Sequence, residues 1–116
     1  PGTAVTCVVY GFMKDGQEDF GRILLAAEIG GKRRHVATMP ASAFPASSRE
    51  ILASRLQPLI TEQASVETQY RGATWVRPTV GLSIEFSGWS VLGEMHVPTL
   101  AKRRPAASPA PLEPNR

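Results

Sequence analysis

The chain has 116 residues, of which 42% are hydrophobic, so it suits one small folded domain and is too apolar for a fully disordered chain. No apolar run approaches the roughly 20 residues of a membrane-spanning helix, and the first residues lack the basic and apolar segments of a secretory signal peptide. The single cysteine, Cys7, excludes an internal disulfide and favours the cytoplasm, while the net charge of +3 permits an anionic partner. Because the chain opens on Pro1 rather than Met, we expect a piece of a longer polypeptide.

The first forty residues are predicted to form a three-stranded antiparallel meander. Apolar and polar side chains alternate here as they do in strands, and Gly30-Gly31 is typical of a two-residue hairpin turn. The expected strands are residues 3–12, 20–29 and 33–39, with a turn at residues 14–17.

A helix is predicted after the break at Pro40–Pro45. Ser47 and Glu50 have the spacing of a capping box, in which the serine hydroxyl accepts from the Glu50 amide and the carboxylate reaches back. Pro58 limits the regular helix to about three turns. The apolar stripe is expected to consist of Ile51, Leu52, Leu56 and Leu59, with Arg49 and Arg55 outside it.

The second half of the chain is predicted to hold a loop and two further strands. Residues 61–72 are polar, Trp75 and Val76 resume strand character, and residues 79–89 alternate most regularly. A last strand is expected at about residues 94–100, after a turn at Gly93. Three strands, a helix and two strands make an all-β fold with one helix, in the order of a five-stranded oligonucleotide-binding (OB) barrel. We expect this domain to span residues 1–104, followed by a disordered Pro/Ala-rich tail at 105–116.

The segment Arg71-Gly72-Ala73-Thr74-Trp75-Val76-Arg77-Pro78, followed by Trp89 and His96, resembles the C-terminal region of ATP-dependent DNA ligases. The resemblance is to bacterial end-joining ligases and their small relatives, and it covers about residues 4–104. It implies an OB domain that grips nicked duplex DNA and assists nick sealing by a separate adenylyltransferase domain in cis. It also implies DNA repair or recombination as the setting, with ATP and Mg²⁺ as cofactors of the parent ligase and none held by this chain.

One departure from the family pattern concerns catalysis. The family ends in Arg-x-Asp-Lys, whose basic groups meet the outer phosphates of ATP, whereas this chain has Lys102-Arg103-Arg104-Pro105. Arg103 and Arg104 are the positions that match the arginine, and the Asp-Lys pair is missing. Lys14-Asp15-Gly16 differs by one residue from the nucleophilic Lys-x-Asp-Gly motif and is better read as a turn. We therefore expect no ligase activity from this chain alone.

Holding DNA of any sequence calls for cations that meet phosphates rather than side chains that read bases. Arg77 is the foremost candidate because it lies inside the ligase-like segment. The full set of candidate phosphate contacts is Arg71, Arg77, Lys32, Arg33, Arg34, Lys102, Arg103 and Arg104.

Other chemically capable residues have simpler interpretations. Cys7 lies in an apolar alternation and is expected to be a small buried hydrophobe. His35 and His96 belong to no cluster with metal-ligand spacing, so we expect no metal site. Trp75 and Trp89 are expected to pack the barrel rather than to stack on bases.

Two alternatives to the ligase interpretation stay open. The altered terminal motif favours a degenerate OB module that binds nucleic acid or a protein without catalysis. A barrel that serves only protein interactions would bind DNA weakly and without salt dependence.

Overall fold

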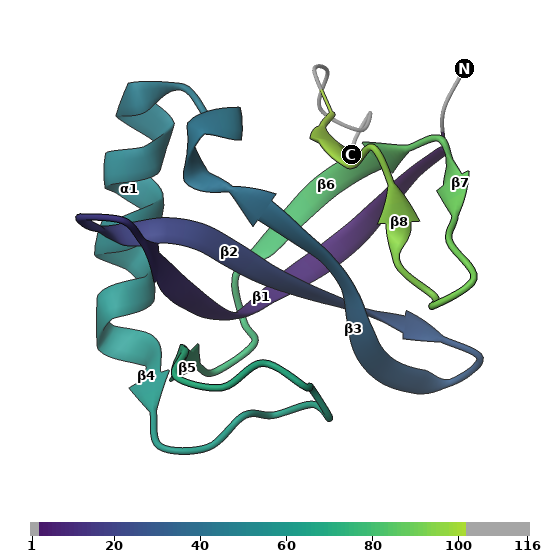
Figure 1. The fold of residues 1–116 in the computed structure, drawn as a ribbon, viewed down its shortest axis with the longest axis horizontal. Coiled ribbons are helices and arrows are strands. Elements are labelled where there is room, and N and C mark those ends of the chain that lie inside the picture. Colours follow the sequence, from purple (N-terminus) through teal and green to yellow (C-terminus); the bar gives the residue numbers. More distant parts are fainter. Residues whose placement is uncertain (1–2, 102–116) are drawn as a thin grey trace, which may run out of the picture.

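The computed structural model describes residues 3–101, which are mostly β with one α-helix (Figure 1). The strands are β1 Thr3–Asp15, β2 Glu18–Ile29, β3 Lys32–Pro40, β4 Ile60–Thr61, β5 Thr74–Val76, β6 Gly81–Phe86, β7 Gly88–Trp89, β8 Met95–His96 and β9 Thr99–Leu100. The helical elements are the 3₁₀ turn η1 Ala41–Ala43, the helix α1 Ala46–Leu56 and the 3₁₀ turn η2 Gln57–Leu59. The predicted all-β class with one helix is confirmed, as is the three-strand meander. The predicted tail at 105–116 lies outside the described residues.

Strand β1 is the centre of the main sheet. It pairs antiparallel with β2 along one edge, and along the other edge with β6 and then β5. Strand β3 adds to β2, and β9 adds to β6, which is the arrangement of a small OB-like barrel. Within residues 3–101, β3 pairs with β2 alone, so the backbone ladders do not close the barrel completely.

Side chains of β1 alternate between two buried clusters, and a β-bulge reverses the alternation after Tyr10. The register with β2 shifts between Val9 and Gly11, which leaves Tyr10 as the extra residue. Cys7 and Val9 join the larger cluster, into which α1 inserts Leu52 and Leu56. Tyr10 joins a smaller cluster with Leu24, Ala26 and Val66.

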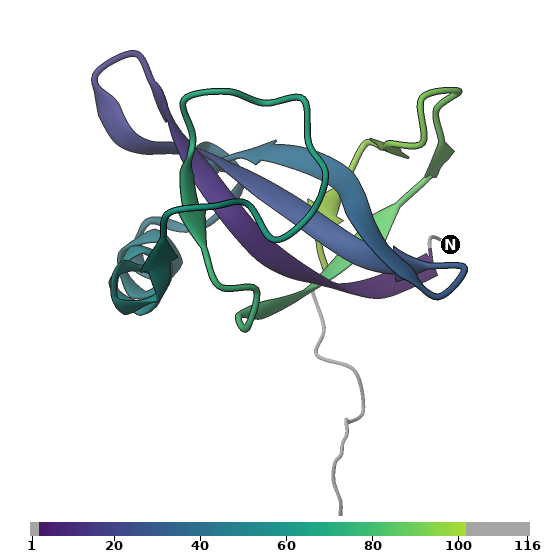
Figure 2. The ribbon, with the colours of Figure 1, turned by 90° about the horizontal axis from the view of Figure 1, so that it is seen from below.

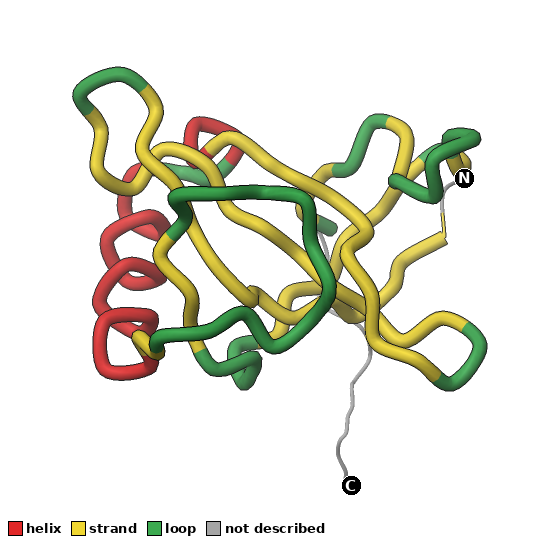
Figure 3. The backbone as a smooth tube through the Cα atoms, turned by 60° about the horizontal axis from the view of Figure 1, so that its bottom comes forward, coloured by secondary structure: helices red, strands yellow, loops and turns green. Residues whose placement is uncertain are grey.

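The smaller cluster lies under the loop of residues 62–73. This loop, drawn in teal and green, crosses the meander in Figure 2, and it is the long green segment in front of the yellow strands in Figure 3. From this loop, the Val66 side chain is buried in the cluster, and Tyr70 and Ala73 pack against it. The polar loop predicted at 61–72 is therefore present, and it covers one face of the sheet.

The start and the stripe of the helix differ from the sequence-based prediction. Helix α1 begins at Ala46, and no side chain caps it, so the predicted Ser47–Glu50 capping box is wrong. Pro45 precedes the helix, and its carbonyl accepts the Arg49 amide at 2.9 Å. Ile51 is 59% exposed, because the i, i+4 pair Leu52 and Leu56 points into the core and turns Ile51 outward.

The last two predicted strands are each interrupted. The predicted strand 79–89 ends as β6 at Phe86, and β7 leaves to pair with β8 in a separate two-stranded sheet. The predicted strand 94–100 is broken at Val97, which has a positive φ of 50° and precedes Pro98. The β7–β8 hairpin therefore projects from the end of the molecule opposite α1 (Figure 1). No helix in the described part of the chain is long and apolar enough to cross a membrane.

Candidate nucleic-acid interface

The described surface has an open groove of about 940 Å³, here called the basic groove. It lies between the start of β3, the loop 62–73 and the tip of the β7–β8 hairpin. Its lining residues are Lys32, Arg33, Arg34, His35, Ala64, Val66, Glu67, Thr68, Gln69, Tyr70, Arg71, Gly72, Trp75 and Leu92. Two basic segments that lie far apart in the sequence thus share one surface.

The cations of the groove come from a hairpin and from a loop. Lys32, Arg33 and Arg34 follow the turn Gly30-Gly31, whose two glycines both have positive φ, and all three are exposed. Arg71 is exposed on the loop, and its Nη1 donates to the carbonyls of Thr68 at 3.3 Å and Tyr70 at 3.1 Å. Glu67 is the carboxylate in the lining, so the fixed charge of the groove is positive.

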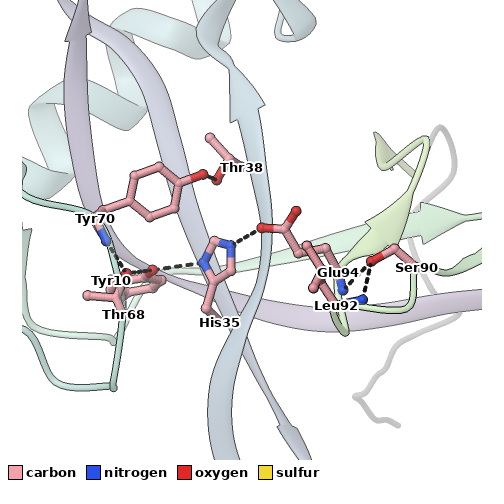
Figure 4. Close-up of polar contacts among 8 residues, drawn as sticks. All are labelled: Tyr10, His35, Thr38, Thr68, Tyr70, Ser90, Leu92 and Glu94. Carbon is pink, nitrogen blue, oxygen red and sulfur yellow. Dashed lines mark hydrogen bonds and ion pairs between the residues drawn. The ribbon is translucent and has the colours of Figure 1, made fainter.

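A chain of hydrogen bonds fixes the side chains beneath the groove (Figure 4). The Tyr10 hydroxyl lies 2.8 Å from Nδ1 of His35 and donates to Oγ1 of Thr68 at 2.9 Å. Nε2 of His35 lies 2.7 Å from a carboxylate oxygen of Glu94, and because a carboxylate only accepts, the imidazole donates this bond. Strands β1 and β3, the loop 62–73 and the β7–β8 hairpin are therefore joined by side chains.

The loop and the hairpin each have a further polar contact. The hydroxyls of Thr38 and Tyr70 lie 2.6 Å apart, which holds the loop to β3. In the hairpin, Oγ of Ser90 accepts the amides of Leu92 at 3.2 Å and Glu94 at 3.1 Å. These bonds hold both walls of the basic groove in place.

Four rings form a continuous row at the floor of the groove, here called the aromatic row. Tyr70 and His35 have centroids 5.4 Å apart, and His35 meets Tyr10 edge-on at 5.8 Å. Tyr10 stacks on Trp75 at 6.0 Å, with an interplanar angle of 7°. His35, Tyr70 and Trp75 also line the groove, whereas Tyr10 is fully buried beneath them.

Burial keeps the Tyr10 phenol and the Cys7 thiol in their neutral forms. Burial raises the pKa of the Tyr10 phenol to about 12, although the bond with Thr68 works in the opposite direction. Burial also raises the pKa of the Cys7 thiol to about 11, and Cys7 is fully buried. Both groups are therefore neutral near pH 7, and Cys7 is the small buried hydrophobe that the sequence predicted.

The structure separates Arg77 from the other candidate phosphate contacts. Arg77 is exposed, its Nη2 lies 3.4 Å from the Pro58 carbonyl beyond α1, and it does not line the basic groove. It was the foremost candidate on sequence grounds, and in the fold it stands apart from Lys32, Arg33, Arg34 and Arg71. Lys102, Arg103 and Arg104, including the altered terminal motif, lie outside the described residues.

The two tryptophans have different surroundings. Trp75 is half-buried and packs on Tyr10, as the sequence predicted. Trp89 is 44% exposed and meets Phe86 at 4.9 Å, so the expectation that it packs the barrel is wrong. The interruption after β6 places Trp89 on the projecting hairpin rather than on a barrel strand. His96 is exposed, and residues 3–101 contain no group of three His, Cys, Asp or Glu side chains suited to a metal ion.

Several residues of this site carry no signal in the sequence. Tyr10 sits in an ordinary apolar alternation, and Thr68 and Tyr70 lie in a polar loop. Glu94 meets His35 across 59 positions of sequence, a pairing that no local pattern indicates.

Comparison with known proteins gives one family and a group of solved structures. A family model described as the ATP dependent DNA ligase C terminal region matches residues 16–107. The fold is similar to mycobacterial DNA ligase D complexed with ATP and MES, with a TM-score of 0.69 and 17% identity. It is also similar to the ligase domain of LigD from M. tuberculosis, with a TM-score of 0.67 and 16% identity. Each match covers 85% of this chain, which spans about a third (33%) of either ligase chain. Curated protein sequences give no significant match.

Proposed function

The chain belongs to the family of C-terminal regions of ATP-dependent DNA ligases, and from this premise we propose that it grips duplex DNA at a nick by laying the phosphate backbone in the basic groove. The observation that carries the proposal is the convergence of Lys32–Arg34 and Arg71 on one open surface. Cations that meet phosphates bind DNA of any sequence, which suits an enzyme that must act at any nick.

In the parent protein, we propose that this domain assists nick sealing by an adenylyltransferase domain in cis. The family is described as ATP dependent, and we propose that the parent ligase uses ATP and Mg²⁺. The described residues offer no cluster of carboxylates for Mg²⁺, so we assign no metal ligand to them. A setting in DNA repair or recombination in the cytoplasm completes the proposal, and the reduced, buried Cys7 is compatible with that compartment.

A titration of nicked duplex DNA at several salt concentrations tests the phosphate grip. Log affinity should fall with log salt by about 0.9 per phosphate contact. The triple variant Arg33→Ala, Arg34→Ala, Arg71→Ala should bind weakly and have a slope that is smaller by about three contacts. Arg55→Ala is the matched control, because it removes an exposed arginine on α1 that does not line the basic groove. Salt-independent binding, or equal slopes for the triple variant and the wild type, would refute the grip.

A degenerate module without a catalytic partner is the second candidate, favoured by Lys102-Arg103-Arg104-Pro105 in place of Arg-x-Asp-Lys. A Lys-x-Asp-Gly motif upstream in the same reading frame would exclude it. By itself the chain should form no covalent lysyl-AMP adduct when it is incubated with ATP and Mg²⁺. Intact-mass spectrometry would detect such an adduct.

A further inference from the structure

We propose that the basic groove binds an unpaired strand of DNA, with its bases stacked on the aromatic row and its phosphates on the surrounding cations. This inference rests on the proposed function and narrows its substrate, because it distinguishes the single strand at a broken or frayed end from intact duplex. The family assignment alone indicates only that the parent acts on DNA.

The first support is the combination of side chains in one lining. His35, Tyr70 and Trp75 line the same groove as Arg33, Arg34 and Arg71. Aromatic rings and cations are the two elements that proteins combine to hold single strands without reading their sequence. A groove that met only duplex phosphates would need the cations and gain nothing from the rings.

The second support is that the rings are already fixed. Tyr70 is held by the 2.6 Å contact of its hydroxyl with Thr38, and His35 is held between Tyr10 and Glu94. Trp75 rests on Tyr10 in a stacked arrangement. A base that stacks on these rings therefore does not have to order them, which favours binding.

The third support is the state of the bases in the two forms of DNA. In a duplex, each base already stacks on its neighbours and shows only its edges in the grooves, so an aromatic row meets backbone instead of base faces. In an unpaired strand the faces are free. Loss of one stacking contact then weakens binding roughly tenfold.

The experiment uses tryptophan fluorescence from a single site. The chain has two tryptophans, so Trp89→Phe leaves Trp75 as the only reporter. This variant is titrated with a thymidine oligomer of about 12 nucleotides, within the size range that such folds bind, and with a duplex of equal length. We expect the single strand to quench Trp75 and to bind more tightly than the duplex. Trp89→Phe itself should bind like the wild type, because Trp89 does not line the groove.

Two substitutions of Tyr70 separate stacking from architecture. Tyr70→Phe keeps the ring and loses the bond with Thr38, whereas Tyr70→Leu loses the ring as well. We expect Tyr70→Phe to bind the single strand within about twofold of wild type and Tyr70→Leu to bind it roughly tenfold more weakly. Binding of duplex should change little in either variant. Thermal melting shows whether the two Tyr70 variants are folded. The fluorescence test with Trp75 is made in Trp89→Phe and does not depend on either Tyr70 variant.

The outcomes distinguish this inference from the proposed function. Equal or weaker binding of the single strand, with no change in Trp75 fluorescence, overturns the inference. If duplex binding then still depends on Arg33, Arg34 and Arg71, the phosphate grip stands. If neither form of DNA binds, both proposals fail.

Discussion

His35 and Glu94 meet at 2.7 Å, between imidazole Nε2 and carboxylate Oε2, and so join β3 to the β7–β8 hairpin. No backbone ladder links these elements within residues 3–101, so side chains make the connection. The same imidazole touches Tyr10, whose hydroxyl reaches the loop 62–73 through Thr68. These hydrogen-bonded side chains therefore tie together the two walls of the basic groove.

Replacing Glu94 should loosen the hairpin more than it destabilises the whole domain. Its side chain is 42% exposed, so we expect Glu94→Ala to lower the free energy of unfolding by about 1 kcal/mol. Hydrogen exchange of the amides of β8 should become faster. Glu62→Ala, at an exposed loop position, is the control. If both variants unfold at the same denaturant concentration and exchange like the wild type, the contact with His35 does not hold the hairpin.

Alanine substitutions at Gly16 and Gly93, which both have positive φ, should distinguish the cost of backbone strain from the effect of a new contact with Arg34. Gly16 has a φ of 65° and open space around it, whereas a Cβ on Gly93, with a φ of 83°, would lie 2.4 Å from Nη2 of Arg34. Alanine at either position should cost about 1 kcal/mol, because both must hold a left-handed conformation. Only Gly93→Ala should shift the side-chain ¹⁵N resonance of Arg34. An unchanged Arg34 resonance would mean that the guanidinium does not rest on the hairpin.

Trp75 and Arg77 should respond differently to truncation. Trp75→Ala removes a half-buried ring that stacks on Tyr10, and we expect a loss of about 3 kcal/mol, near the lower end for aromatic core sites. Arg77 is exposed, so Arg77→Ala should change stability by less than about 0.5 kcal/mol. Because Arg77 lies outside the basic groove, its removal should leave the salt dependence of DNA binding unchanged, whereas Arg71→Ala should reduce the slope by about one contact. Thermal melting tests the two stability expectations, and salt titrations test the two binding expectations. Equal changes in the salt slope for Arg77→Ala and Arg71→Ala would contradict the binding expectations.

Tyr10 should make the fold sensitive to alkali. Burial raises its pKa from 10.0 to about 12, so the folded state holds the phenolic proton more tightly than the unfolded state. This contribution to stability is fully present below about pH 10 and is lost as the pH rises toward 12, at no more than about 1.4 kcal/mol per pH unit.

The measurement requires a background without the Cys7 thiol, because burial raises the pKa of that group too. The Cys7 thiol, whose pKa is raised from 9.0 to about 11, has the same sign, so the comparison belongs in Cys7→Ala. There, Tyr10→Phe should flatten the dependence of the free energy of unfolding on pH above pH 10. An equally steep dependence in Tyr10→Phe would show that its phenol is not the group responsible.

The elements that the sequence predicts well are those coded by neighbouring residues. Alternation along residues 3–12 and 20–29, and the pair Gly30-Gly31, indicate strands and a hairpin, and the structure has them as β1, β2 and the turn before β3. Leu52 and Leu56 likewise indicate the buried side of α1. The segment from Arg71 to Pro78 carries the resemblance to ligases, and the family model includes it. All of these signals lie within a few residues, where periodicity and turn chemistry act directly.

What only the tertiary structure decided depends on residues that meet across long stretches of chain. The bulge at Tyr10 reverses the alternation after it, so that Phe12 packs against the larger cluster, and the break after Phe86 turns the chain into a hairpin that brings Glu94 to His35. The same folding places Arg71 beside Lys32–Arg34 and leaves Arg77 elsewhere. Local patterns encode which face of a strand is apolar, but they do not encode which distant cation or ring shares that face. Packing of the whole sheet sets that choice.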